Sequence, residues 1–420
     1  MSLVIRSSSA EAPGQFRLPI AVTRVAVMLA GMAITPLPLW SPPARAAEAE
    51  FHYQAGLNET YSGDVFRDGS DQDDFISDLV ATANLLVKSP RSEATFSYVP
   101  EYLLYDRFDT LNHFDQRYIG SWIVHPGARS EFSLRQGFSN TTRRVGFQDL
   151  AGAGASGSEP VTGITRLLAW DLEPHWSLKT GPNGAVSAGA LYRAARYSEP
   201  DLIDSDQFGL NWGMDGPVGR YQRLGGQVRL DAYQYWLDEG TLGPVYDRFI
   251  NGQGTWLLKE AEQTSLWIAA GVFRGSGKDL DPVTGPTFDL TGTWHWRRSF
   301  LSASLDSGYS SGGGISTTDR SYQAAAAWTA QWGRGCQLAI SGSYIRREPI
   351  GDTTGPTTPL YGRSGSFWLS RSWLNGVGIR FGLTALRQEQ TGENGLSYGE
   401  ATLGLTYSPP VPSPRPVPAT

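Results

Sequence analysis

Charged side chains of both signs alternate with apolar residues along many segments of this 420-residue chain. Alternate side chains of a β-strand point to the same face, so the charged residues would share one face and the apolar residues the other. The candidate functional residues on this basis are Glu101, Asp115, Arg117, Glu131, Arg135, Arg229, Asp231, Asp289, His295, Asp306 and Arg380. A polar face of this kind is typical of the lining of a water-filled pore.

The mixture of signs bears on what such a pore would admit. A strongly anion- or cation-selective pore shows one dominant sign of charge around its constriction, whereas carboxylates and guanidinium groups are mixed here. Polar groups beside Tyr233, Tyr235 and Trp368 would suit a neutral or polymeric sugar. The alternative is that the charges pair with one another and only hydrate the interior.

Little in the sequence indicates an enzyme, a metal site or a cofactor. The five histidines are not spaced as metal ligands on a helix, and the single Cys336 excludes an intrachain disulfide and a CxxC metal site. Gly152, Gly154 and Gly157 match G-x-G-x-x-G, but the buried strand and the helix that a dinucleotide site requires are not expected around them. We predict no enzyme and no cofactor. A Ser–His pair formed across neighbouring strands is the alternative.

Four acidic residues, Asp68, Asp71, Asp73 and Asp74, cluster in one polar segment. Carboxylate oxygens are ligands of Ca²⁺ and Mg²⁺, so this cluster could hold a divalent cation near lipopolysaccharide. A solvated charged loop is the favoured interpretation.

The composition narrows the class of protein. The formal net charge is −6 and the pI is about 5.5, with no basic domain, so nucleic acid is not an expected partner. Hydrophobic residues make up 40% of the chain, yet the mean hydropathy is −0.29. No apolar run after residue 40 approaches the length of a membrane helix, which needs about 20 residues. A bundle of membrane helices is therefore not predicted.

The elements that would position the charged residues are strands. Apolar residues recur at every second position in rows such as 208–214, 322–332 and 377–385. Short turns, for example at 88–91 and 333–335, alternate with longer polar segments, for example 140–162 and 347–361. Outer-membrane barrels have short periplasmic turns and longer extracellular loops. The sequence therefore predicts an all-β fold, a single transmembrane antiparallel up-and-down β-barrel of about 18 strands (16–18) over residues 47–408. The two long loops could fold inward and narrow the pore.

Aromatic residues support a membrane location. Many lie near the expected strand ends: Trp122, Trp236, Trp256, Trp294, Trp296, Trp332, Trp373 and Tyr407. Trp and Tyr are enriched where a barrel meets the membrane–water interface. We expect these residues to form girdles rather than to fill a core.

The two ends of the chain differ from the rest. Residues 1–46 are predicted to be a signal peptide, with Arg17 and Arg24 before the apolar stretch 25–34 and an A-x-A cleavage site at Ala44-Arg45-Ala46. A membrane anchor is the alternative. Residues 409–420 form a Pro-rich tail that we expect to be disordered. The expected location is the bacterial outer membrane, with its lipid and lipopolysaccharide as partners.

The first predicted hairpin carries a family-level signal. Asn58-Glu59-Thr60-Tyr61-Ser62 is followed by Asp73-Asp74-Phe75-Ile76 and by the tyrosine-rich segment 96–102. This pattern resembles the outer-membrane β-barrel porins associated with bacterial exopolysaccharide systems. The chain has Ser62-Gly63-Asp64 where that family carries an acidic residue and Asn. The resemblance covers the first quarter of the chain and carries over no catalytic residues.

The resemblance implies a passive conduit for exopolysaccharide export, with polysaccharide and periplasmic export components as partners. A general or sugar-selective diffusion porin is the alternative within the same class. An outer-membrane hydrolase or a structural barrel with a plugged lumen is the alternative of another class.

Overall fold

Strands make up nearly all of the chain that the computed structural model describes. The described residues are 48–65, 72–144, 164–181, 184–198, 203–236, 244–260, 263–277, 280–311, 318–333, 335–350, 359–373, 376–390 and 396–409. The predicted signal peptide and nearly all of the predicted tail lie outside these residues. Within them, no helix is long and apolar enough to cross a membrane.

Eighteen strands follow one another along the chain. They are β1 (Glu48–Ser62), β2 (Asp74–Ser89), β3 (Ser92–Tyr105), β4 (His113–Gly127), β5 (Ser130–Arg144), β6 (Ile164–Lys179), β7 (Ala185–Tyr197), β8 (Asp204–Pro217), β9 (Gln222–Trp236), β10 (Val245–Glu260), β11 (Thr264–Gly277), β12 (Val283–Trp296), β13 (Ser299–Ser311), β14 (Thr318–Trp332), β15 (Cys336–Pro349), β16 (Leu360–Ser372), β17 (Val377–Gln390) and β18 (Leu396–Tyr407). A 3-10 turn, η2 (Asp109–Leu111), lies between β3 and β4.

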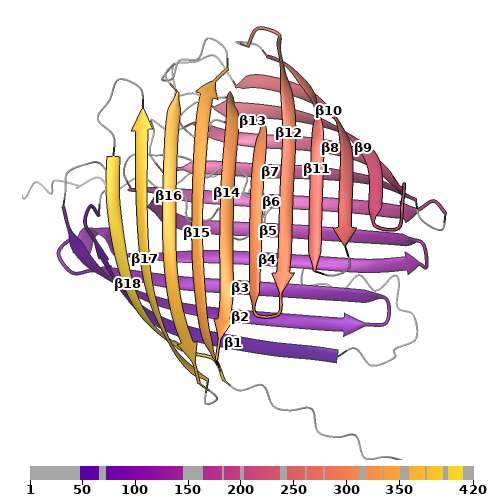
Figure 1. Cartoon of the computed structure of the whole chain (residues 1–420). Coiled ribbons are helices and arrows are strands. Elements are labelled where there is room, and N and C mark those ends of the chain that lie inside the picture. Colours follow the sequence, from indigo (N-terminus) through magenta and orange to yellow (C-terminus); the bar gives the residue numbers. More distant parts are fainter. Residues whose placement is uncertain are drawn as a thin grey trace, which may run out of the picture. The chain divides into compact units, whose positions relative to one another are not determined.

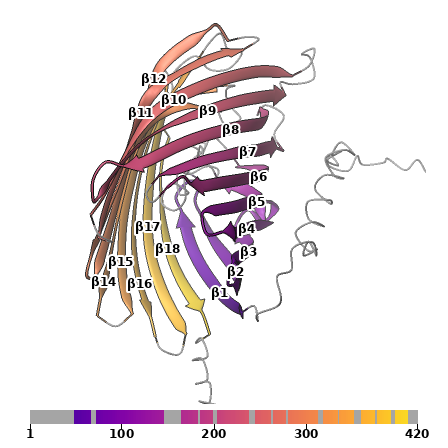
Figure 2. The ribbon, with the colours of Figure 1, turned by 90° about the vertical axis from the view of Figure 1, so that its right-hand side faces the viewer.

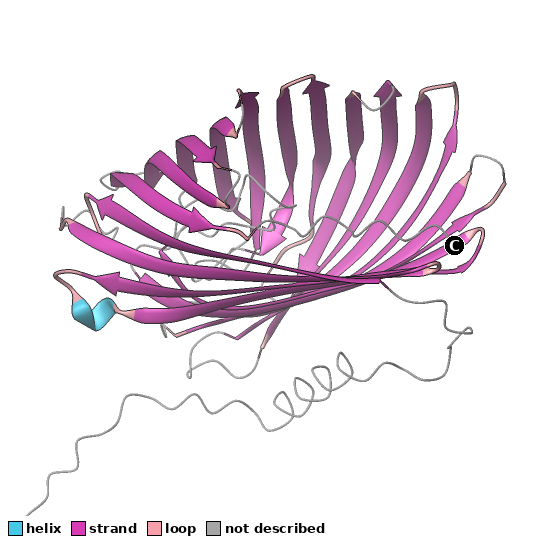
Figure 3. Cartoon of the chain, turned by 90° about the horizontal axis from the view of Figure 1, so that it is seen from below, coloured by secondary structure: helices cyan, strands magenta, loops and turns pink. Residues whose placement is uncertain are grey.

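The sheet closes on itself. Each strand pairs antiparallel with the next along the chain, and β1 also pairs with β18 from Ala55↔Tyr407 to Ser62↔Glu400. Figure 1 shows β14–β18 on one side of the barrel and β2–β7 on the other, and Figures 2 and 3 show the same sheet from the side and from below. Closure pairs the backbone N–H and C=O groups without leaving a sheet edge, which a lipid environment requires. The predicted transmembrane barrel of about 18 strands is confirmed.

The two faces of the sheet differ as the alternation predicts. Leu210, Trp212 and Met214 on β8 are 47%, 46% and 68% exposed. The register joins them to exposed apolar residues on the neighbouring strands, such as Leu230 and Ile250. The opposite face is the inner one, because residues of β9 on that face contact β13 and β14, which are not their neighbours in the sheet. The apolar belt therefore faces the lipid.

The predicted girdle aromatics all have the parity of this outer face. All but Trp236 lie at the end of the barrel where short turns join the strands, which we call the short-turn end. Trp332 and Trp296 are among the most exposed, at 69% and 56%. Trp236 lies at the opposite, long-loop end.

Glycine and proline close to the short turns do not end the strands at once. The strands β4 and β8 continue through such residues, because Gly127 still pairs with Ser130 and Pro217 with Arg223. At two tight turns only glycine fits. Gly335 has φ 79° and Gly376 has φ 84°. A Cβ at Gly335 would lie 2.1 Å from the backbone oxygen of Ser372 at the end of β16, and a Cβ at Gly376 would lie 2.0 Å from that of Ser408, which follows β18.

Candidate functional site

The inner face of the barrel carries all the residues that the sequence analysis selected. Because neighbouring strands lie in fixed register, the parity of one strand determines that of the next. The positions are Glu101 on β3, Asp115 and Arg117 on β4, Glu131 and Arg135 on β5, Arg229 and Asp231 on β9, Asp289 and His295 on β12, Asp306 on β13 and Arg380 on β17. They lie around most of the circumference and do not converge on one point.

The inner face of β2–β10, which we call the charged wall, contains several ion pairs. Arg117 lies 2.8 Å from Glu101, and Arg193 lies 2.7 Å from Glu173. Arg229 and Asp231, two residues apart on β9, lie 2.7 Å apart. Each pair brings opposite charges together, so the field of the wall is largely cancelled at short range.

Further ion pairs on the charged wall lie nearer the short-turn end. Arg223 pairs with Asp215, and Lys88 pairs with Glu93 at 3.7 Å. Nearby, His125 Nε2 lies 3.2 Å from a Glu131 carboxylate oxygen. These contacts bear out, for this wall, the sequence-based alternative that inner charges pair with one another.

A few inner charges have no ion-pair partner within 4 Å in the described part of the chain. Examples are Arg135, Asp171, Asp289, Asp306 and Arg380. Asp289 and Asp306 lie opposite each other in the β12–β13 ladder, and Thr291 donates a hydrogen bond to Asp289 at 3.2 Å. The Arg380 guanidinium lies 3.6 Å from the centroid of the Trp368 ring. The field around an unpaired charge is stronger than that around a paired one.

The inner face of β14–β18 and β1, which we call the hydroxyl wall, is built differently. Ser341 and Ser366 form a hydrogen bond of 2.6 Å, as do Ser343 and Ser364. Thr60 and Thr402 lie 3.0 Å apart across the closing ladder. Many inner positions here are Ser, Thr, Ala or Gly, and the charged inner residues among them include Asp319, Arg347, Arg380 and Glu400. Between these charged residues the wall offers uncharged donors and acceptors.

Trp368 is a large aromatic residue on the hydroxyl wall. It pairs in register with Gly382, and a Cβ at Gly382 would come within 2.0 Å of the indole ring. The ring therefore depends on the missing side chain of its partner. Trp368 and Arg380 together form an aromatic and cationic surface on the inner face.

The β13–β14 hairpin leaves the wall at its long-loop end. The β12–β13 ladder stops at Phe288↔Ser307, although β12 extends back to Val283 and β13 on to Ser311. Beyond that point the Tyr309 ring stacks on Phe249 of β10 at 4.3 Å. Phe249 pairs in register with Asp231 and lies on the inner face, so the contact with Tyr309 lies inside the barrel. The end of this hairpin therefore occupies part of the lumen.

Hydrogen bonds fix the end of the hairpin in place. The Tyr309 hydroxyl donates to Asp231 at 2.7 Å. Thr318 donates to Asp247 at 2.7 Å and lies 3.0 Å from the Tyr235 hydroxyl. These residues surround a buried cluster that includes Tyr233, Tyr235, Val245, Phe249, Phe273 and Leu280.

Sequence alternation did not identify Tyr309 and Thr318. Tyr309 has the same parity as the outward-facing Leu301 and Leu305, so the pattern assigns it to lipid. Where the hairpin bends, the face of β13 that elsewhere points to lipid points to the interior. The two-residue alternation of the sequence does not indicate such a bend. The loops that we expected to narrow the pore, 140–162 and 347–361, lie largely outside the described residues.

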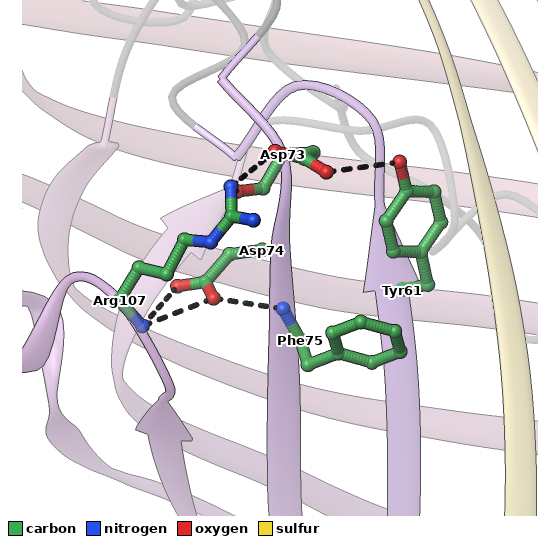
Figure 4. Close-up of polar contacts among 5 residues, drawn as sticks. All are labelled: Tyr61, Asp73, Asp74, Phe75 and Arg107. Atoms are coloured by element: carbon green, nitrogen blue, oxygen red, sulfur yellow. Dashed lines mark hydrogen bonds and ion pairs between the residues drawn. The ribbon is translucent and has the colours of Figure 1, made fainter.

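Two residues of the acidic cluster in the first loop form a clamp (Figure 4). The Asp73 carboxylate lies 2.5 Å from the Arg107 guanidinium and accepts a hydrogen bond from the Tyr61 hydroxyl at 3.2 Å. Asp74 is buried and accepts backbone N–H groups of Phe75 at 2.8 Å and Arg107 at 3.1 Å. The clamp ties the start of β2 to the β3–β4 connection.

The clamp accounts for two of the four carboxylates considered as cation ligands. Asp68 and Asp71 lie outside the described residues. Among the residues that the structure covers, no group of His, Cys, Asp or Glu could hold a metal ion.

Comparison with known proteins gives structural matches alone. No family model matches the sequence, and no curated protein matches it. Pseudomonas aeruginosa OccK2 (OpdF) matches over 86% of this chain and 98% of its own, with 12% identity and a TM-score of 0.42. The outer membrane protein OpdK of the same organism matches over 86% and 98%, with 10% identity and a TM-score of 0.40. Acinetobacter baumannii OccAB3 matches over 86% and 99%, with 11% identity and a TM-score of 0.40.

These matches assign no solute to this chain. None of them ties it to exopolysaccharide systems, so the family suggested by the first hairpin stays a prediction.

Proposed function

We propose that this barrel is a passive diffusion pore of the bacterial outer membrane for small hydrophilic solutes, with a preference for neutral, hydroxylated ones such as sugars. The observation that carries the proposal is the exposure of inner-face side chains between the two ends of the barrel. Arg117 is 46% exposed although it is ion-paired, and Ile119 on the same face is 50% exposed. Side chains that fill a packed core would be buried.

The chemistry of the two walls supports this solute class. A hydrated lumen removes most of the free-energy cost of moving a polar molecule through hydrocarbon. The paired charges hold water without creating a strong field of one sign, so they do not concentrate ions of one charge. The hydroxyl wall and Trp368 can exchange hydrogen bonds and ring contacts with a sugar.

Reconstitution tests the proposal. The purified mature chain in a planar bilayer is expected to give steady conductance with weak ion selectivity. In liposomes it should admit neutral monosaccharides faster than anions or cations of similar size. A barrel that inserts without conducting, or that admits ions of one sign far better than sugars, would contradict the proposal.

Export of exopolysaccharide is the second candidate. The observation that favours it is the hydroxyl wall, which could line the path of a neutral polymer. A deletion strain distinguishes the two functions. Loss of surface polysaccharide with polymer trapped in the periplasm supports export, whereas intact surface polysaccharide with slower sugar uptake supports diffusion of small solutes.

We also propose that residues 1–46 are a signal peptide, which is removed when the chain is exported to the outer membrane. The mature protein, isolated from outer membranes, is expected to begin near Ala47. A chain that retains residues 1–46 would indicate an anchor instead.

A further inference from the structure

An open groove crosses the outer face of the barrel over β6 to β11, six consecutive strands that follow one another in Figure 2. Its volume is about 700 Å³. The outward side chains that line it are mainly apolar and include Tyr192, Phe208, Leu210, Leu230, Ala232 and Ile250. Because this face meets lipid, acyl chains are the natural occupants of such a surface.

Two arginines line the same groove at its long-loop end. Arg248 on β10 pairs with Ser276, and Arg274 on β11 pairs with Ile250. The two arginines are thus diagonal neighbours on one face, and the Cα atoms of such neighbours lie about 7 to 8 Å apart. That spacing lets both guanidinium groups reach one anion. Within the described residues, neither arginine has an acidic partner within 4 Å.

A third outward arginine at the long-loop end, Arg196, differs from these two because it has acidic partners. Arg196 on β7 lies 2.8 Å from Asp206 and 3.8 Å from Asp204, and its guanidinium lies 4.4 Å from the centroid of the Trp236 ring. Its charge is satisfied within the protein. The outward positions around Arg248 and Arg274 on β9–β12 carry no carboxylate. An external anion would complete this site.

We infer that this groove binds a phosphorylated lipid of the outer leaflet, with its acyl chains along β6–β11 and a phosphate between Arg248 and Arg274. Guanidinium groups bind phosphate through paired, charge-assisted hydrogen bonds. Basic pockets at the ends of membrane-spanning segments bind anionic headgroups for the same reason. The choice of leaflet rests on the proposed outer-membrane orientation, in which the long loops face the cell exterior.

Lipid retention by the detergent-purified mature chain tests the inference. The probes are lipid A with both phosphates and the same lipid with its phosphates removed, and bound lipid is counted by native mass spectrometry. The wild-type chain is expected to retain the phosphorylated lipid. The R248A/R274A chain should retain it about tenfold less, since charge-assisted bonds to phosphate are the stronger class.

Two further variants distinguish binding of the lipid phosphate from binding of the acyl chains. R248K/R274K keeps the charge but loses the planar fork, so it should lie between the wild-type chain and the alanine variant. Ala232→Trp fills the groove beside Arg248 without changing the charge and should also weaken retention. The matched control is Arg220→Ala, an exposed arginine at the short-turn end of the β8–β9 hairpin, which should retain lipid like the wild-type chain.

The outcomes are distinct from those of the pore proposal. Equal retention of both lipids, or unchanged retention by R248A/R274A, overturns the lipid site. Conductance is measured on the same samples, and its absence would remove the pore function and leave the lipid site intact.

Discussion

The charged wall and the hydroxyl wall line the same lumen and meet the same requirement by different means. Both must present polar groups to water on one face while the other face contacts lipid. The charged wall does so with long ionic side chains that hold one another in position, such as Arg193 and Glu173. The hydroxyl wall does so with short side chains that pair across neighbouring strands, such as Ser343 and Ser364.

The two walls should differ in how much stability is lost when a polar side chain loses its partner. A buried ion that loses its partner is expensive, because its charge stays out of water without compensation. A hydroxyl that loses its partner can hydrogen-bond to water in the lumen. The Arg229–Asp231 pair, whose carboxylate is fully buried, is therefore the most fragile point of the charged wall, whereas a half-exposed pair such as Arg193–Glu173 contributes little to stability.

Removing the Arg229 guanidinium is expected to have the largest effect. Asp231 is fully buried and would keep only the hydrogen bonds from Gln207 and Tyr309. Arg229→Ala should lower the free energy of unfolding by about 3 kcal/mol. Urea denaturation followed by tryptophan fluorescence measures the change. The double variant with Asp231→Asn should recover part of the loss, and a single variant as stable as the wild-type chain would disprove the role of the pair.

A comparable test on the hydroxyl wall is to remove the space beneath Trp368. Gly382→Ala places a Cβ against the indole ring, so the ring must move, and overpacking should cost about 2 kcal/mol. The displaced ring and Arg380 should also change the single-channel conductance. Gly365→Ala on β16 is the matched control, since its new Cβ would meet nothing closer than 4.0 Å. Equal effects from both variants would show that the Trp368 ring does not depend on the space left by Gly382.

Much of this comparison could be predicted from sequence. The faces follow from alternation, because lipid and water demand different side chains on the two sides of every strand. The Arg229–Asp231 pair is also visible, because residues two apart on a strand share a face. The Arg193–Glu173 and Ser343–Ser364 contacts are not, because they depend on the register between strands. The Tyr309–Phe249 contact depends on a hairpin that leaves the wall, and no local pattern reports that departure.

Unpaired charges should control the modest ion selectivity of the pore. Asp289→Asn/Asp306→Asn removes two inner carboxylates without disturbing an ion pair, so cation preference should fall. Across a wet lumen the effect is about 0.5 kcal/mol, or roughly twofold in the permeability ratio. Arg380→Gln should shift the ratio the other way. Reversal potentials in a KCl gradient measure both.

Neutralising a paired site is the control for selectivity. Arg193→Gln/Glu173→Gln removes one charge of each sign from the charged wall and should leave the reversal potential unchanged. A shift as large as that of the Asp289 and Asp306 variant would mean that pairing does not cancel the field of the wall.

The smallest effect is expected where one hydroxyl is removed from the hydroxyl wall. Ser343→Ala breaks the 2.6 Å hydrogen bond to Ser364, but Ser364 can bond to lumen water instead. The free energy of unfolding should change by about 0.5 kcal/mol or less. Sugar flux into liposomes should fall slightly while conductance in KCl stays constant, because the hydroxyl interacts with the sugar and carries no charge. A loss of stability near that of Arg229→Ala would show that the hydroxyl wall is as rigid as the charged one, and the contrast between the two walls would be lost.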